Sequence, residues 1–368
     1  MTNMTTPAPV DRPAVSIITG FLGSGKTTLL NRLLQDPGLA NAAVIINEFG
    51  AVALDHLLVA TPGENMVMLT SGCICCTVRG DLVDTLRDLH LKRQAADIPR
   101  FDRLLIETTG LADPVPILQT VITDAGLAPL FRLDSVVALV DGVHGEKQLD
   151  THPEAVKQAA LADRLLITKS DLAAKEAIAA LRARLVQLNP GAGVFTVVRG
   201  EIAPGNLFGA ALDEAARSAE VARWLNMEGF TGAAAHSHRH DHADNERIRA
   251  FCVYYDEPVN AAGLMLWLKM LAGLRGANLL RVKGLLNVEG RPVVVQAVQT
   301  LIHEPVELAR WPDDERRSRL VFITRGMKRA EIENTLAAFK LGAEPCSPHG
   351  AIDPQAYARF VAVAKNFR

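Results

Sequence analysis

Three glycines separate an apolar strand-like run from an apolar helix-like run in ITGFLGSGKTTLLNRLL, residues 18–34, and this arrangement most constrains the fold. Residues 20–27, GFLGSGKT, satisfy the pattern G-x-x-x-x-G-K-[ST] in the strand-then-helix context that the pattern requires. Glycines let the backbone curl so that consecutive N–H groups point inward at an anion, and the following helix adds its positive end. The stretch predicts a phosphate-binding loop; the alternative is a glycine-rich turn with a chance lysine.

The residues of this loop suit a nucleoside triphosphate and its magnesium ion. We expect Lys26 to reach the β- and γ-phosphates and the Thr27 hydroxyl to ligate Mg²⁺. The residues predicted to hold phosphate and magnesium are Gly20, Gly23, Ser24, Gly25, Lys26, Thr27 and Thr28.

An acidic residue ends another apolar run, in RLLIETTG. Glu107 closes this run and Gly110 follows three residues later, as in the aspartate-x-x-glycine element of many GTPases, with glutamate in place of aspartate. Open α/β sheets bind ligands at the carboxyl ends of their strands, so we expect Glu107 to support the magnesium ion and Gly110 to meet the γ-phosphate. With Lys26 and Thr27, Glu107 forms the predicted catalytic set. The alternative is an ordinary turn residue.

The run RLLITKSD bears on the choice of base. Thr168, Lys169, Ser170 and Asp171 resemble the asparagine-lysine-x-aspartate element that recognises guanine, with threonine in place of asparagine. The carboxylate of Asp171 would accept the N1 and N2 protons of guanine, and adenine has no such pair of donors. We therefore expect Lys169 and Asp171 to bind the base of GTP. Alternatively, Ser170 or Asp171 caps the following helix.

The order of apolar runs predicts the fold class. Runs that are apolar on both faces alternate with helical stretches, which is typical of a doubly wound, mainly parallel α/β sheet covered on both sides. These runs are residues 15–19, 43–47, 67–70, 103–107, 135–141, 164–168 and 194–198. Beyond a polar break, strands at 248–255, 279–287, 291–299 and 319–325 with helices at 261–273 and after Met327 predict a smaller C-terminal α+β domain.

These patterns divide the chain into five parts. The proposed division is a flexible N-terminal tail (1–12), a P-loop domain (13–215), a histidine-rich linker (216–246), the α+β domain (247–345) and a C-terminal segment (346–368).

Three of the five cysteines lie in GCICC, as Cys73, Cys75 and Cys76. Three thiolates this close supply soft ligands for Zn²⁺, and a tetrahedral site needs a fourth ligand such as Glu48 of INEFG, water or a partner. The alternatives are redox chemistry or a merely buried trio. The isolated Cys252 and Cys346 are interpreted as packing residues.

Alternate histidines mark the linker. In HSHRHDH, an extended chain places His236, His238, His240 and His242 on one side, which predicts a modest and unselective metal site. The alternative is a solvated low-complexity linker without a ligand.

Composition excludes several classes of protein. The chain has 368 residues and a formal net charge of −2, which gives no general attraction for nucleic acid or acidic membranes. The N-terminus lacks the apolar core of a secretion signal, and no later run reaches the eighteen apolar residues of a membrane span. We expect a cytoplasmic protein that binds neither nucleic acid nor membrane.

Together these motifs resemble the CobW-type family of P-loop GTPases, which act in metal trafficking. The matching stretches are GFLGSGKTTLLNRLL, INEFG, SGCICCTVRGDL, ETTGLADP, TKSDL, the histidine-rich linker, RVKGLL and LVFITRG. The resemblance implies that Cys73, Cys75 and Cys76 bind a transition metal, Zn²⁺ or Co²⁺, with Glu48 as an added ligand. AVALD follows INEFG where the family usually has an acid-bearing run, which leaves Asp55 as the nearest further carboxylate.

The resemblance also implies a function. It predicts a GTP-hydrolysing metallochaperone that couples GTP binding and hydrolysis to metal insertion into a client metalloprotein. Intrinsic turnover is expected to be slow, because no glutamine or arginine stands in a motif-defined place to orient the attacking water. Two alternatives are a P-loop kinase of an unknown acceptor and a non-catalytic zinc store.

Overall fold

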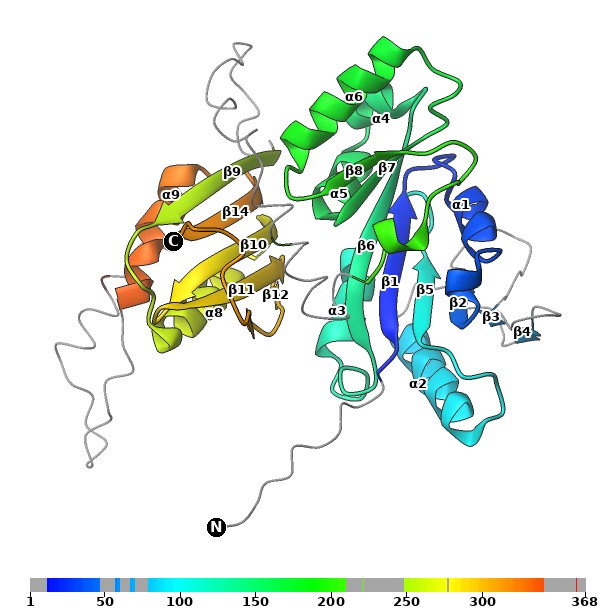
Figure 1. The fold of residues 1–368 in the computed structure, drawn as a ribbon, viewed down its shortest axis with the longest axis horizontal. Coiled ribbons are helices and arrows are strands. Elements are labelled where there is room, and N and C mark those ends of the chain that lie inside the picture. The colour runs from blue at the N-terminus through cyan, green and yellow to red at the C-terminus, as the bar shows by residue number, and fades with distance from the viewer. Residues whose placement is uncertain are drawn as a thin grey trace.

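The computed structural model describes residues 12–46, 57–59, 67–69, 79–209, 248–276 and 278–340, with the isolated positions 221 and 362. These residues form two sheets, each with its own helices, and the two halves lie side by side (Figure 1). The expected α/β domain followed by a smaller α+β domain is confirmed at the level of fold class.

The larger sheet has eight strands in the order β4-β3-β2-β5-β1-β6-β7-β8. The six strands from β2 to β8 in this order are parallel to their neighbours. The strands are β1 Ala14–Gly20, β2 Ala42–Ile46, β3 Leu57–Val59, β4 Val67–Leu69, β5 Arg103–Glu107, β6 Arg132–Asp141, β7 Arg164–Thr168 and β8 Gly193–Thr196.

Helices cover both faces of this sheet because its parallel strands are apolar on both sides. Ile18 packs with the apolar side chains of α1 on one face, whereas its neighbour Ile17 packs with those of α2 and α3 on the other. The helices are α1 Lys26–Leu33, α2 Arg79–Ala95, α3 Val115–Thr123, α4 Gly145–Thr151, α5 Pro153–Leu161 and α6 Lys175–Leu188.

The edge of the sheet differs from the sequence-based expectation. β3 was not predicted, and it pairs antiparallel with both β2 and β4. The predicted run at 67–70 is therefore a strand in an antiparallel edge rather than a member of the parallel sheet. Because two reversals restore the direction, β4 runs the same way as β2, and both end at the edge where β1 ends.

The smaller sheet is antiparallel, in the order β12-β11-β10-β14-β9 with β13 paired to β11. Trp267 of α8 is fully buried and packs edge-on against Phe322 and Phe339, and its indole N–H donates to Thr335 Oγ1 at 2.8 Å. The short strands β12 and β13 were not predicted. The elements are β9 Ile248–Tyr255, α8 Ala261–Arg275, β10 Leu279–Val288, β11 Arg291–Val298, β12 Leu301–Ile302, β13 Val306–Glu307, β14 Ser318–Arg325 and α9 Arg329–Thr335.

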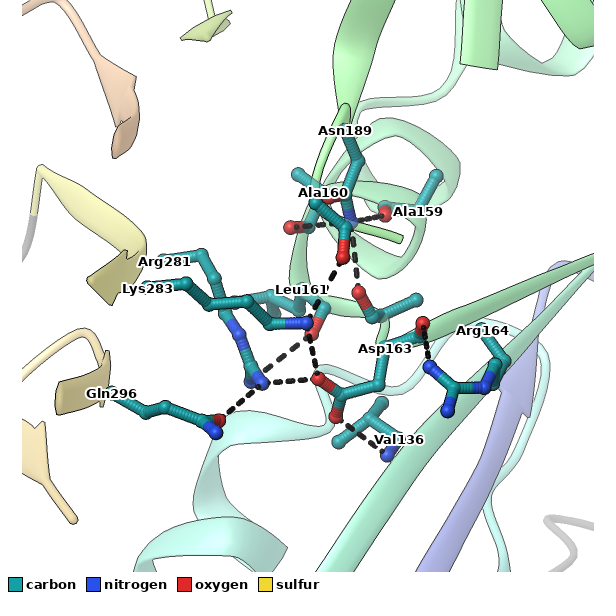
Figure 2. Close-up of polar contacts among 12 residues, drawn as sticks. Val136, Ala159, Ala160, Leu161, Asp163, Arg164, Asn189, Arg281, Lys283 and Gln296 are labelled. Carbon is teal, nitrogen blue, oxygen red and sulfur yellow. Dashed lines mark hydrogen bonds and ion pairs between the residues drawn. The ribbon is translucent and has the colours of Figure 1, made fainter. Parts of the chain in front are cut away.

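The two halves share a hydrophobic cluster and a buried ionic one. Leu280 and Ile323 of the smaller sheet belong to the same apolar cluster as Leu118 and Leu161 of the larger domain. Beside it, the Asp163 carboxylate contacts Arg281 and lies 3.0 Å from Lys283 Nζ (Figure 2).

The charge of Asp163 is set by these contacts. Burial alone would raise the pKa of Asp163, but Arg281, Lys283 and the backbone N–H of Val136 outweigh it and hold that pKa well below its usual range. Arg281 and Lys283 are each only 3% exposed, so the carboxylate is what compensates their charge.

No helix within the described part of the chain is both long and apolar enough to traverse a bilayer.

Candidate nucleotide site

Four neighbouring parallel strands end at one edge of the larger sheet, and each ends in a residue with phosphate-, metal- or base-binding chemistry. In sheet order, β5 ends at Glu107, β1 at Gly20, β6 at Asp141 and β7 at Thr168. The register places Asp141 opposite Thr168 and Ile18 opposite Glu107. The carboxyl edge of such a sheet is where open α/β folds bind ligands.

The loop after β1 depends on its glycines. Gly23 and Gly25 have φ of 71° and 93°, a backbone region that side chains with a Cβ rarely adopt. At Gly20, with φ of 144°, an added Cβ would lie 2.5 Å from the carbonyl oxygen of Leu139. The loop therefore has a shape that only glycine permits at these positions, and α1 begins directly after it at Lys26.

Lys26 lies inside the curl of the loop. Its Nζ donates to the carbonyl oxygens of Gly20 at 2.9 Å and Phe21 at 3.2 Å, and the residue is 8% exposed. The ammonium group is thus held at the centre of the predicted phosphate loop. Thr28, two residues further along, is exposed.

Thr27 and Glu107 meet although 80 residues separate them in the sequence. The Thr27 hydroxyl donates to Glu107 Oε1 at 3.1 Å, and Glu107 is 5% exposed. Hydroxyl and carboxylate oxygens are the hard donors that Mg²⁺ prefers, so this pair fits a magnesium ion chemically.

Gly110 packs directly against the phosphate loop. A Cβ added at Gly110 would lie 2.7 Å from the backbone nitrogen of Leu22, so the close approach requires glycine. The carbonyl oxygens of Gly110 and Ala112 accept from Gln158 Nε2 of α5, at 3.2 and 3.0 Å.

Thr168, which stands where the predicted guanine-binding motif usually has asparagine, links the end of β7 to the phosphate loop. The Thr168 hydroxyl donates to the carbonyl oxygen of Ser24 at 2.7 Å, and Thr168 is 6% exposed. The end of β7 therefore supports the phosphate loop from the side.

Lys169 and Asp171 extend from this strand end. Lys169 adopts φ of 53°, and its Nζ lies 2.6 Å from Asp141 Oδ2. Burial would raise the pKa of Asp141, but the hydrogen bond from Lys169 and two backbone N–H donors lower it below its usual value. The cap alternative for Ser170 and Asp171 is wrong, since α6 begins at Lys175 with Ala174 as its N-cap and no side-chain cap.

The predicted metal ligands fall outside the described residues. These are Glu48, Asp55, Cys73, Cys75, Cys76, His236, His238, His240 and His242. The chain that carries Glu48 continues from the end of β2, and the cysteine motif lies between the end of β4 and the start of α2. Both β2 and β4 end at the edge that carries the phosphate loop. Across the described residues, no group of three potential metal ligands gathers.

The sequence reasoning missed Asp141 and Gln158. Asp141 carries the signal that identified Glu107, an acid at the end of a buried apolar strand, and that signal was available in SVVALVD. Gln158 carries no such signal, because one glutamine on a short amphipathic helix is ordinary.

Comparison with known proteins gives the family. The model "CobW/HypB/UreG, nucleotide-binding domain" matches residues 14–196, and "Cobalamin synthesis protein cobW C-terminal domain" matches residues 248–340. The zinc chaperone YjiA of Escherichia coli (strain K12) is 36% identical over 334 residues, which span 89% of this chain and 98% of YjiA. The zinc chaperone CobW of Sinorhizobium sp is 28% identical over 338 residues, spanning 84% of this chain and 91% of the relative.

A solved structure agrees with the sequence matches. The crystal structure of Zn(II)-bound YjiA GTPase from E. coli superposes with a TM-score of 0.64 at 31% identity, over 89% of this chain and 99% of that one. Because the similarity runs through the phosphate-loop domain and the C-terminal domain alike, the chain belongs to the CobW family.

Proposed function

We propose that this protein binds and hydrolyses GTP and couples that cycle to the delivery of zinc to a client metalloprotein. The observation that best supports it is the convergence of Gly20, Glu107, Asp141 and Thr168 at the ends of four adjacent strands. Relatives named as zinc chaperones and a zinc-bound structure of YjiA support the metal. Co²⁺ is the second metal that the same thiolate ligands would accept.

The chain's own groups account for phosphate binding. Phosphate oxygens would replace the carbonyl oxygens of Gly20 and Phe21 as acceptors of Lys26, and the N–H of Gly110 would donate to the γ-phosphate. Thr27 and Glu107 would hold Mg²⁺, which when bound neutralises charge on the β- and γ-phosphates. Catalysis is then positioning and electrostatic stabilisation, and a slow intrinsic rate is expected.

Guanine selectivity would come from the strand end of β7. Asp171 would accept the two protons of guanine, and Lys169, held by Asp141 at 2.6 Å, would lie beside the base. Asp171→Asn reverses the hydrogen-bonding sense at that atom, so we expect it to lose GTP and gain xanthosine triphosphate in competition binding.

Zinc is the cargo of the proposed cycle. Cys73, Cys75 and Cys76 would hold it, with Glu48 brought toward them when GTP orders the chain after β2, and hydrolysis would release it. In YjiA, a triple mutant with one glutamate and two cysteines replaced by alanine also crystallised with Zn(II) bound, so that protein holds zinc without those three side chains as well. The histidines of the linker would add a weaker, less selective store.

The test of hydrolysis is phosphate release from GTP without any acceptor. Lys26→Ala should abolish it while circular dichroism shows an unchanged fold, and the exposed Lys269→Ala is the matched control that should keep the full rate. Hydrolysis that persists in Lys26→Ala contradicts the assignment. Release without an acceptor also excludes an obligate kinase, and any release excludes an inert zinc store.

The test of coupling is zinc affinity in two nucleotide states. Zinc should bind with different dissociation constants in the presence of GDP and of a nonhydrolysable GTP analogue, and linkage requires zinc to change nucleotide affinity by the same factor. Cys73→Ser should weaken zinc binding, whereas Cys252→Ala, a buried thiol of the smaller sheet, should not. Equal zinc affinity in both nucleotide states contradicts the coupling.

A further inference from the structure

Helix α5 contacts the candidate site with residues in its middle and the C-terminal domain with its end. It is nine residues long, from Pro153 to Leu161. Lys157 and Gln158 face the loop of residues 110–114, called here the 110–114 loop, while Leu161 and the following Asp163 face β10.

Gln158 holds the 110–114 loop by its amide nitrogen. Gln158 is 2% exposed, and its Nε2 donates to the carbonyl oxygens of both Gly110 and Ala112. Its Oε1 is buried and has no hydrogen-bond partner among the described residues. Lys157 adds an ion pair to Asp113 of the same loop at 2.5 Å.

The position that Gln158 imposes is the one next to the phosphate loop. Gly110 lies so close to Leu22 that an added Cβ would lie 2.6 to 2.8 Å from Leu22 atoms. A glycine N–H that is already placed beside the phosphate loop needs little rearrangement to meet a γ-phosphate, and such preorganisation favours binding.

The far end of α5 is anchored by the C-terminal domain. Arg281 Nη1 donates to the carbonyl oxygen of Leu161 at 3.5 Å, and both Arg281 and Lys283 contact Asp163 (Figure 2). Asn189 Nδ2 holds three carbonyl oxygens around the same helix end, those of Ala159, Ala160 and Ala162. The helix end is therefore fixed from two sides.

The 110–114 loop has room to leave this position. A cavity of about 260 Å³ lies between residues 111–114, residues 153–158 of α5 and Arg325 of the smaller sheet. The cavity leaves space beside the loop, so the packing of the protein does not by itself fix the loop there, and the two Gln158 bonds are what hold it beside the phosphate loop.

We propose that Gln158 is a positioning residue for the γ-phosphate loop and that the C-terminal domain, through α5, stabilises the GTP-binding position of that loop. The inference rests on the proposed GTP cycle. The C-terminal domain then has a function in the nucleotide cycle: the contact of Arg281 with the end of α5 raises the affinity for GTP relative to the affinity for GDP.

The experiment measures dissociation constants for GDP and for a nonhydrolysable GTP analogue by fluorescence titration of the full chain. Gln158→Met keeps the length of the side chain and removes both donors, so the ratio of analogue affinity to GDP affinity should fall by roughly five- to thirtyfold with GDP binding unchanged. Arg281→Met should lower the same ratio, and the double variant should fall no further than Gln158→Met alone.

Arg319→Met is the matched control. Arg319 is a buried arginine of the same sheet, and its Nη1 and Nη2 donate to Asp313 of the C-terminal domain rather than to α5. This variant should leave the ratio unchanged even if it lowers the melting temperature, which separates positioning from general destabilisation.

Three results overturn the inference. These are an unchanged ratio in Gln158→Met, additive effects of Gln158→Met and Arg281→Met, or an equal fall in Arg319→Met. If the wild type binds neither nucleotide, the proposed GTP cycle fails instead. If it binds both in a Lys26-dependent way and the ratio does not respond, only the coupling through α5 fails.

Discussion

Asp163 is the residue whose replacement should cost the most stability at the junction of the two halves. Asp163→Asn keeps the size of the side chain but removes the charge that compensates Arg281 and Lys283. Both cations come from β10 and are 3% exposed, so neither can regain water without separating the two halves. Removing one partner of a buried ionic cluster costs about 3–5 kcal/mol, because charge is left buried without compensation.

The assay is urea unfolding at pH 7, followed by far-ultraviolet circular dichroism, with calorimetry to give the melting temperature. At about 2–4 °C per kcal/mol for chains of 150–250 residues, the expected fall in melting temperature is roughly 10 °C. Asp97→Asn is the control, since this exposed aspartate makes the same change of charge at the surface and should stay within about 0.5 kcal/mol of the wild type.

A second variant tests the cause of the loss. Adding Arg281→Met to Asp163→Asn removes one of the two buried cations, so the double variant should be at least as stable as Asp163→Asn. A cost below about 1 kcal/mol for Asp163→Asn, or a further full loss in the double variant, would refute the argument that uncompensated charge is responsible.

Three other contacts, one at the junction and two at the nucleotide edge, predict measurable effects. Burial and the nearby Arg281 and Lys283 lower the pKa of His303 to about 4 against the opposing effect of Asp163. The imidazole takes up a proton near pH 6.5 in the unfolded chain but only near pH 4 in the folded protein, so the free energy of unfolding falls as pH drops from about 6.5 to 4. His303→Leu should remove this fall, which amounts to at most about 3 kcal/mol in urea unfolding. The same dependence on pH in the variant contradicts the assignment. Thr168→Val should weaken GDP binding about fivefold in calorimetric titration, whereas Thr168→Asn restores a donor and should retain it. Gly110→Ala should weaken a GTP analogue more than GDP, and equal losses would show that Gly110 does not approach the γ-phosphate.

The strands were predictable because burial on both faces leaves a strong local signal. Ile17 and Ile18 face opposite cores, so the whole run is apolar, and neighbouring residues within β5, β6 and β7 face opposite cores in the same way. β3 has three residues, too few for a pattern, and no local signal tells whether a short apolar strand runs parallel or antiparallel. The direction of β4 therefore came only from its pairing.

The junction could not be predicted from local sequence. Arg281 and Lys283 alternate with apolar residues in RVKGLL, a pattern that normally predicts a strand with one face in water. They are buried because Asp163 lies opposite, and 118 residues separate Arg281 from that aspartate. The contacts of Gln158 and the pairing of Lys169 with Asp141 are likewise long-range. The phosphate loop, in contrast, could be recognised from its own eight residues, although long-range contacts from Thr168 and Gly110 support it.

A hydrophobic cluster joins the larger domain to four residues of the smaller one, Leu280, Val298, Leu301 and Ile323. This cluster has a consequence for proteolysis and truncation of the protein. A protease that cleaves between residues 209 and 248 would give two fragments on a denaturing gel, yet they should elute together from a sizing column. Expressing residues 1–209 alone would expose the apolar side chains of α3 and α5 that those four residues cover. Such a fragment should aggregate or bind chaperones, and nucleotide affinities measured on it would not represent those of the full chain.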